Sequence, residues 1–358
     1  MLLLGILLVG QGFQPWMIGP FAKADSANPI LRPLSKPLFD CPMVGKPVAW
    51  EANHVFNPAA VVRNGKIYVL FRAEDETGTG VGGHTSRIGL AESVDGLHFT
   101  RRSTPVLFPA VDSQKSNEWD GGCEDPRIVE RPGGGYVLTY TQWNRKTARL
   151  AVATSNDLVR WTKHGYIFAD AYGGRFKDQW SKSGSIVTRR IGDHLVAAKI
   201  GGKYWMYWGE KFIYVATSPD LVHWTPLLKK DGSLDYAFGT REGKFDSDLV
   251  EPGPPAVLTQ RGIVFLYNGK NAAKGGEKSL RPGAYAAGQA LLDPKNPKRL
   301  LQRCSSYFFR PERPYEMTGQ YAAGTVFIEG LVSFKKKWFL YYGTADSLVA
   351  VATTAQKD

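Results

Sequence analysis

The stretch Leu150-Ala-Val-Ala-Thr-Ser-Asn-Asp-Leu-Val-Arg-Trp161 decides the fold, because its pattern recurs along the chain. Each copy begins with a short apolar run, and the clearest copies continue into a turn rich in Ser, Asn, Asp or Gly and then an aromatic residue. Short runs with a period of two, bounded by turn residues, are typical of β-strands, and no long helical period competes with them. The copies are residues 88–99, 150–161, 213–224, a degraded copy at 285–294 and a truncated one at 348–353.

These copies start roughly 60 to 70 residues apart, and each is preceded by two more strand-like runs. A repeat of this kind supplies three or four strands, and small sheets repeated in this way are typical of a propeller. We therefore predict an all-β fold in which residues 13–358 form a single five-bladed β-propeller. The segments that enter the first strand of each repeat would converge at one end of a central tunnel. Residues 30–56 would pack across or close the ring.

Charge and cysteine content narrow the classes of function. The formal net charge is +12, but the basic residues are scattered in pairs, and the single run, Lys335-Lys336-Lys337, falls where a hairpin turn is expected. We interpret this charge as solvated surface and do not expect nucleic acid as a partner. The three cysteines, Cys41, Cys123 and Cys304, form no CxxC pair, which argues against a zinc site and leaves at least one thiol free in a monomer. Cys123 fits a small buried filler better than a nucleophile.

The N-terminus carries a short apolar run, Met1-Leu-Leu-Leu-Gly-Ile-Leu-Leu-Val-Gly10. It is too short to span a membrane as a helix. It is similar to the apolar core of a signal peptide, although no Lys or Arg precedes it. We treat residues 1–12 as a candidate signal segment, which favours a periplasmic or secreted protein, with a cytoplasmic location as the alternative. No membrane insertion of the remaining chain is expected.

Three carboxylates far apart in the sequence occupy similar positions, at the end of a strand-like run and next to Gly or Pro. Asp125 lies in Gly121-Gly-Cys-Glu-Asp-Pro-Arg127, Glu210 closes Lys203-Tyr-Trp-Met-Tyr-Trp-Gly-Glu210, and Glu251 opens Glu251-Pro-Gly-Pro-Pro-Ala256. A buried carboxylate without a partner is costly, so such positions suggest a use. Cleavage of a glycosidic bond needs an acid for the leaving oxygen, and an inverting hydrolase also needs a base about 6.5–9.5 Å away. The pattern is compatible with a sugar-processing site.

The residues alone leave a structural alternative open, in which these carboxylates pair with Arg72, Arg127 or Lys182 and tie the repeats together. Aromatic side chains near the same segments, Trp119 and Tyr342 among them, could stack on sugar rings, but each one singly is more typical of packing between strands. The residues that we predict to bind substrate are Asn57, Arg72, Glu74, Asp75, Glu124, Arg127, Lys182, Trp208, Tyr267 and Asp346.

One motif is misleading. Gly78-Thr-Gly-Val-Gly-Gly83 matches GxGxxG, but a strand-like run follows it where a dinucleotide site requires a helix. We expect a flexible loop near the site instead. The sequence contains no GxSxG, HExxH or P-loop motif, and we predict neither a metal nor a cofactor.

The chain resembles glycoside hydrolase family 130, the five-bladed propeller enzymes that act on β-mannosides. The resemblance extends over residues 16–346, and its segment Glu124-Asp-Pro-Arg127 is fairly specific in a propeller. The segments that carry it are Gly19-Pro-Phe21, Asn28-Pro-Ile-Leu31, Phe56-Asn-Pro-Ala-Ala60, Tyr68-Val-Leu-Phe-Arg-Ala-Glu-Asp75, Gly122-Cys-Glu-Asp-Pro-Arg127, Trp208-Gly-Glu210 and Glu251-Pro-Gly-Pro-Pro255.

The resemblance implies roles for the three carboxylates. Asp125 matches the family's proton donor, which acts through the 3-hydroxyl of the mannose. Glu210 and Glu251 resemble the pair that activates water in the hydrolytic, β-1,2-specific subgroup, and we do not choose between them. The histidine with which the family's phosphorylases bind phosphate is missing, because Asn268 follows Tyr267. Two carboxylates would repel phosphate but could orient and deprotonate water.

The resulting hypothesis is an inverting, exo-acting β-mannosidase that hydrolyses β-1,2-linked manno-oligosaccharides. A β-mannoside phosphorylase using inorganic phosphate is the alternative enzyme. A mannose-binding propeller without activity is an alternative of another class, which the three intact carboxylates disfavour. A β-mannoside oligosaccharide is the one partner that we expect.

Overall fold

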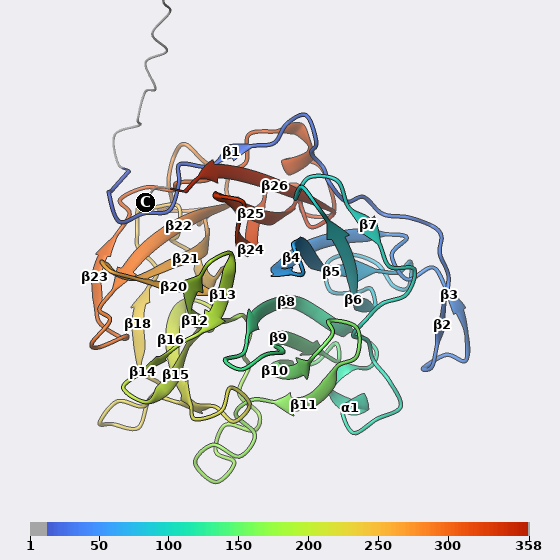
Figure 1. Ribbon diagram of the computed structural model, residues 1–358, viewed down its shortest axis with the longest axis horizontal. Coiled ribbons are helices and arrows are strands. Elements are labelled where there is room, and N and C mark those ends of the chain that lie inside the picture. Colours follow the sequence, from blue (N-terminus) through green and yellow to red (C-terminus); the bar gives the residue numbers. More distant parts are fainter. Residues whose placement is uncertain (1–12, 357–358) are drawn as a thin grey trace, which may run out of the picture.

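The computed structural model describes residues 13–356, and nearly all of its regular structure is β-strand, which confirms the predicted all-β class (Figure 1). The candidate signal segment, residues 1–12, lies outside the described residues. Within them, strands that follow one another in the sequence pair into five antiparallel groups. The only helical elements of this part are α1 (Lys115–Glu118) and the 3-10 helix η1 (Pro314–Glu316). No helix in residues 13–356 combines the length and apolar character that a membrane crossing requires.

The first two groups are regular meanders of four strands, in which each strand pairs with the next. Group 1 contains β4 (His54–Arg63), β5 (Lys66–Glu74), β6 (Ser86–Ser93) and β7 (Thr100–Arg101). Group 2 contains β8 (Gly122–Glu130), β9 (Tyr136–Trp143), β10 (Ala148–Ser155) and β11 (Thr162–Tyr166).

Groups 3 and 4 follow the same plan with interrupted strands. Group 3 contains β12 (Gly184–Ile191), β13 (His194–Ala197), β14 (Lys199–Ile200), β15 (Lys203–Trp208), β16 (Phe212–Ser218), β17 (Thr225–Pro226) and β18 (Tyr236–Gly239). Group 4 contains β19 (Leu249–Pro252), β20 (Ala256–Thr259), β21 (Gly262–Lys270), β22 (Tyr285–Leu292) and β23 (Leu300–Arg303).

Group 5 combines the two ends of the chain. Its sheet has the order β1-β26-β25-β24, so the N-terminal strand β1 (Ala22–Lys23) completes a sheet made by β24 (Val326–Phe334), β25 (Lys337–Thr344) and β26 (Leu348–Ala355). Asn28 strengthens this junction, because its side chain exchanges two hydrogen bonds with the backbone of Val351. The junction therefore begins earlier than the predicted segment 30–56, part of which forms the separate hairpin β2 (Phe39–Cys41) and β3 (Lys46–Val48).

The first strands of three groups lie on the inside. In Figure 1, β4, β8 and β24 lie near the middle of the view. Sparse parallel pairings connect neighbouring groups, between β6 and β8, β8 and β13, and β12 and β20. In each group the chain enters the first strand from the same end. The first residues of these strands therefore lie on the same face, and the entry segments converge there.

The quoted repeat forms the same turn in three groups. Ser155 Oγ accepts the backbone N–H groups of Asp157 and Leu158, while Asp157 Oδ1 accepts those of Val159 and Arg160. The turn after β6 and the turn after β16 repeat this pattern, through their own Ser and Asp residues. Short polar side chains that bond to nearby backbone groups stabilise such turns, which explains why the sequence pattern recurs.

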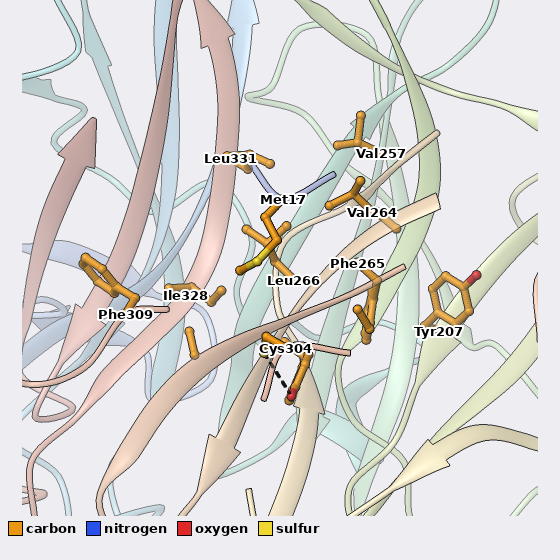
Figure 2. Close-up of a cluster of buried hydrophobic side chains, with 14 of the residues drawn as sticks. Met17, Tyr207, Val257, Val264, Phe265, Leu266, Cys304, Phe309, Ile328 and Leu331 are labelled. Carbon is orange, nitrogen blue, oxygen red and sulfur yellow. Dashed lines mark hydrogen bonds between the residues drawn. The ribbon is translucent and has the colours of Figure 1, made fainter. Parts of the chain in front are cut away.

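The buried apolar residues lie between the sheets. The largest cluster joins groups 3, 4 and 5, and Met17 of the N-terminal segment packs into it (Figure 2). Cys304 belongs to the same cluster. All three cysteines are buried and unpaired, and burial raises the pKa of the Cys123 thiol well above its usual range, as expected of a filler rather than a nucleophile.

Candidate active site

The entry segments of several groups carry polar residues in the left-handed backbone region. Asn57, Asp125 and Ser183, at the entries of groups 1 to 3, have φ values of 46°, 47° and 55°, and Asp346, in the turn between β25 and β26, has a φ of 50°. Asn57 and Asp125 each lie at a β-bulge of an inner strand, in β4 and in β8. Bulges re-aim side chains, and non-glycine residues in this region are concentrated at functional sites. The backbone thus turns these side chains out of the regular alternation of a strand.

Asp125 is held by two donors. Its Oδ1 accepts Asn57 Nδ2 at 2.9 Å and Arg72 Nη1 at 3.1 Å. The side chain is only 6% exposed. Burial alone would raise the pKa of Asp125, but the charges of Arg72 and Lys182 and the Asn57 hydrogen bond outweigh it, so the pKa lies below its ordinary value. Without substrate, Asp125 is therefore ionised near neutral pH.

Arg72 is the centre of an acidic cluster in groups 1 and 2. Its Nη2 lies 2.6 Å from Glu74 Oε1 and 2.8 Å from Glu124 Oε1. Burial raises the pKa of Glu124 to about 7, against the opposing charge of Arg72. A second carboxyl nearby, Asp346, also has its pKa raised to about 7, again chiefly by burial. The predicted residues Asn57, Arg72, Glu74, Glu124 and Asp346 therefore surround Asp125, through direct contacts or through their charges.

Glu251 lies deep in the same face. It is 4% exposed, and Ser183 Oγ donates a short hydrogen bond to its Oε1. Burial and the neighbouring charge of Glu210 raise the pKa of Glu251 to about 7, while Lys182 and Arg127 oppose the shift. Ser183 was not predicted, although it lies in the entry segment of group 3 that sequence analysis had singled out through Lys182.

Glu210 is the more accessible member of this pair. It is half-buried, and its Oε2 accepts the indole N–H of Trp180 at 2.8 Å. The backbone N–H of Gly209 bonds to the carbonyl of Lys182 at 3.0 Å, which brings the Glu210 turn beside the group 3 entry. Trp180 was not predicted, because it lies in the long connection between β11 and β12, away from any strand pattern.

Lys182 shows that the two carboxylate sets face one region. The pKa of its ammonium group is raised although burial lowers it, because Glu210, Glu251, Glu124 and Asp125 all act on it. A cation whose pKa responds to all four charges lies within electrostatic range of each of them. The structure thus brings the three predicted catalytic carboxylates together around Lys182.

Arg127 is buried, and its side chain bonds to other parts of the protein. Its Nε and Nη2 donate to the carbonyls of Gly253 at 3.0 Å and Pro252 at 2.7 Å, and Nη2 lies 3.0 Å from Glu329 Oε1. Glu329 is fully buried in β24, and burial raises its pKa well above the ordinary range despite Arg127. Sequence analysis missed Glu329, because it lies inside an apolar strand. The one available signal was that this acidic residue interrupts the apolar pattern of the strand.

Three other predicted substrate-binding residues do not face this region. Asp75 points to Arg87, whose Nη1 lies 2.7 Å from Asp75 Oδ2. Trp208 is fully buried and packs against Phe168, with ring centroids 4.6 Å apart. Tyr267 is fully buried, and its hydroxyl donates to Asp246 at 2.8 Å.

Trp119 and Tyr342 were considered as aromatic side chains that could stack on sugar rings, and the structure does not favour that role for Tyr342. Tyr342 is buried and donates to Glu316 at 2.9 Å, so it packs between sheets. Trp119 is half-buried, directly after α1. The Gly78–Gly83 loop connects β5 and β6, as expected for a segment without a helix, and the carbonyl of Gly82 accepts the indole N–H of Trp143 at 3.0 Å.

One group of residues has ligand atoms close enough for a metal ion: His54, Glu74 and His84, whose ligand atoms lie within 4.8 Å of one another. Both Glu74 oxygens already accept hydrogen bonds, from Arg72 and from Gln320. A divalent cation there would lie next to the Arg72 guanidinium, whose like charge would oppose it. The donor set therefore fits a hydrogen-bonded network better than a metal centre.

Chemically, the arrangement offers the buried, ionised carboxylate of Asp125 and the carboxylate pair of Glu210 and Glu251. Asp125 is positioned by fixed donors, and Glu251 has a pKa suited to accept a proton near neutrality. Lys182 balances the charge between them. Carboxyl groups with different proton affinities are the groups that acid–base cleavage of a glycosidic bond uses.

Comparisons with known proteins relate the chain to enzymes that act on mannosides. A family model described as "beta-1,4-mannooligosaccharide phosphorylase" matches residues 23–358. A 1,2-beta-oligomannan phosphorylase of Thermoanaerobacter sp. (strain X514) is 29% identical over 317 residues, which cover 86% of this chain and 92% of that protein.

Two solved structures are more similar. One, described as a proposed glycosidase from Bacteroides thetaiotaomicron VPI-5482, is 54% identical with a TM-score of 0.95, and the match covers 97% of this chain and 100% of that one. The other is 53% identical with a TM-score of 0.95, covering 97% and 96%. It is described with the statement that the GH130 family of mannoside phosphorylases contains glycoside hydrolases that target β-1,2-mannosidic linkages in Candida mannan.

Proposed function

Because the chain belongs to glycoside hydrolase family 130, we propose that it is an inverting, exo-acting β-mannosidase that hydrolyses β-1,2-linked manno-oligosaccharides. The observation that carries the proposal is the pairing of Glu251 with Glu210, in which burial and the shared negative field raise the pKa of Glu251 to about 7. A base with that pKa is suited to activate water at neutral pH. The same two negative charges disfavour a phosphate dianion.

Asn268 supports water over phosphate as the nucleophile. By the resemblance to the family, it follows Tyr267 at the place where the phosphorylases are expected to carry a phosphate-binding histidine. Its side chain is fully buried and exchanges hydrogen bonds with Ile328, accepting the N–H at 2.8 Å and donating to the carbonyl at 3.1 Å. The amide oxygen and one of the two amide N–H groups are thus bonded within the protein, and the side chain is held in the interior.

In the proposed reaction, Asp125 supplies a proton that reaches the glycosidic oxygen through the mannose 3-hydroxyl. The Glu210–Glu251 pair takes a proton from a water molecule while the oxygen of that water attacks the anomeric carbon. The attack comes from the face opposite the leaving group and inverts the configuration. Asp125 must be protonated in the reacting complex. A bound sugar covers its carboxyl and adds to the desolvation that raises its pKa, against Arg72 and Lys182.

We also infer that the five antiparallel groups are the blades of a propeller, and that residues 13–358 are one domain. Hydrogen bonds between entry segments of neighbouring groups, from Asn57 to Asp125 and from Ser183 to Glu251, support this arrangement. For residues 1–12 we propose a signal segment and hence a periplasmic or secreted enzyme. N-terminal sequencing of protein from a fractionated native host tests this, and an intact Met1 on cytoplasmic protein would contradict it.

Product analysis on β-1,2-mannobiose, with and without inorganic phosphate, tests the function. Equal release of free mannose in both, with α-mannose formed first by NMR, is the expected result. Mannose 1-phosphate formed only with phosphate would make the protein a phosphorylase, as the curated relative named above is. Binding without turnover on any β-mannoside would favour a mannose-binding propeller.

A further inference from the structure

Trp180 is the tryptophan that the structure leaves most open to solvent. It is 44% exposed, whereas every other tryptophan in residues 13–356 is buried or half-buried. A large aromatic ring in water forfeits the free energy of burial, so an exposed ring beside a reaction centre indicates a surface that a ligand covers. The indole N–H of Trp180 also donates a hydrogen bond to Glu210 Oε2 at 2.8 Å.

The exposed ring belongs to a connected rim. Trp180 packs edge-on against Trp143, with ring centroids 5.9 Å apart and an interplanar angle of 73°. Trp143 in turn donates from its indole N–H to the carbonyl of Gly82, in the loop between β5 and β6. Gly82, Trp143, Trp180 and Glu210 come from three strand groups, so the rim is held from several sides.

We propose that Trp180 is a positioning and substrate-covering residue: its indole N–H orients the Glu210 carboxylate, and its exposed face packs on the bound mannoside. This inference rests on the proposed function for the role of Glu210. Oε2 of Glu210 is occupied by the indole, which leaves Oε1 to face the water. Sugar rings have apolar C–H faces, and aromatic side chains at binding sites supply large, rigid contact areas for such surfaces.

The two members of the carboxylate pair are therefore held differently. Glu251 is buried and bonded to Ser183, a hydroxyl inside the protein, whereas Glu210 is bonded to a side chain that substrate contacts. A sugar that packs on Trp180 would limit the motion of that ring and, through the hydrogen bond, of Glu210. Occupancy of the site and alignment of the base would then be linked.

The variant Trp180→Phe tests the positioning role, because it keeps an aromatic ring and removes the N–H. A hydrogen bond donated to a carboxylate favours its ionised form, so its loss makes the pair take up a proton more readily. The other groups that face Glu210 electrostatically are Glu251, Lys182 and Tyr285, and all remain. We expect the acidic limb of the kcat/KM profile to move to higher pH by about half a unit or more, with a roughly tenfold lower kcat.

Trp205→Phe is the matched control. The indole N–H of Trp205 donates to the backbone carbonyl of Ile200 at 2.9 Å. This variant therefore loses one comparable hydrogen bond, in the strand group that also carries Glu210, but the lost bond does not involve a carboxylate. It should leave the pH profile unchanged. An acidic limb that is the same in Trp180→Phe and wild type would overturn the positioning role. A Trp180→Met variant, which also lacks a side-chain N–H or O–H donor, gives the same comparison if the phenylalanine variant fails to fold.

The covering role has a test that does not need turnover. Acrylamide quenching of tryptophan fluorescence is measured for Asp125→Asn protein, with and without β-1,2-mannobiose. We expect the sugar to protect the exposed fluorophore, and the protection to be lost in Asp125→Asn/Trp180→Phe although mannobiose still binds by calorimetry. Equal protection in both proteins would overturn the proposal, whereas a phosphorylase product in the activity assay would overturn only the hydrolytic function.

Discussion

At the scale of single residues, Asp125 combines two opposing demands. Asn57 and Arg72 fix its carboxyl and lower its pKa, yet a proton donor must carry a proton when substrate is bound. We expect Asp125→Asn to lower kcat on β-1,2-mannobiose by about 10²–10⁴-fold, the usual contribution of a general acid. An aryl β-mannoside, whose leaving group needs little protonation, should lose much less. Equal losses on both substrates would contradict the acid role.

Burial of Glu251 raises its pKa and lowers the free energy of unfolding when the group is ionised. Its pKa of about 7 lies above that of an unfolded glutamate, so the folded state binds the proton more tightly and loses stability as pH rises from about 4 towards 7. Ionisation of the same group is what catalysis requires, so kcat/KM should fall as pH drops below about 7. A pH–rate profile flat from pH 5 to 8 would contradict this assignment.

The variant Glu251→Gln separates the two effects. It keeps an acceptor for Ser183 but removes the buried charge. We expect loss of hydrolysis together with a gain in the free energy of unfolding on the order of 1–3 kcal/mol at pH 8, and a much smaller gain at pH 5. Urea unfolding at both pH values measures the difference. A variant less stable than wild type at pH 8 would show that Glu251 is not strained by its burial.

At the scale of elements, the repeated Ser-x-Asp turn fastens the outer edge of three strand groups. In the turn after β10, Ser155 and Asp157 each accept two backbone N–H groups. Replacing Asp157 by Ala should lower the free energy of unfolding by about 1–2 kcal/mol, because backbone donors lose their partner. The backbone hydrogen bonds from Arg160 and Val159 also lower the pKa of Asp157, so this stabilisation should be complete above about pH 4 and vanish as pH falls further.

Asn156 provides the control for this turn. It is exposed and lies between the two bonded residues. Asn156→Ala should change the free energy of unfolding by less than about 0.5 kcal/mol, as is usual for surface positions. Denaturant titrations of both variants at pH 7 and pH 3 check the prediction, and an equal effect of the two substitutions would mean that the side-chain bonds of Asp157 contribute nothing.

At the scale of the whole molecule, Arg127 connects groups that are far apart in the sequence. From β8 it bonds to carbonyls at the end of β19 and beyond, and pairs with Glu329 of β24. Arg127→Met should cost about 3–5 kcal/mol, because it leaves Glu329 and two carbonyls unpaired in the interior. The double variant Arg127→Met/Glu329→Gln should recover part of that loss at a pH high enough to ionise Glu329, since glutamine then removes the unpaired charge. Calorimetry on both variants tests this, and additive losses would contradict the pairing.

Local patterns in the sequence were sufficient for the strands and for the positions of the main carboxylates. Alternation of apolar and polar residues, with turn residues at regular spacing, depends only on the two-residue period of a strand, so groups such as β8 to β11 could be predicted. Asp125, Glu210 and Glu251 could be found because an acidic residue beside Gly or Pro at a strand end stands out from its neighbours.

Tertiary structure alone decided which side chains face the site. Alternation separates the two faces of a strand but does not say what covers each face, so Trp208 and Tyr267 looked suitable for sugar and are in fact buried between sheets. The partners Trp180 and Glu329 depend on contacts between distant groups. The raised pKa of Glu251 likewise arises from burial and from Glu210 on a neighbouring group, and neither acts until the chain has folded.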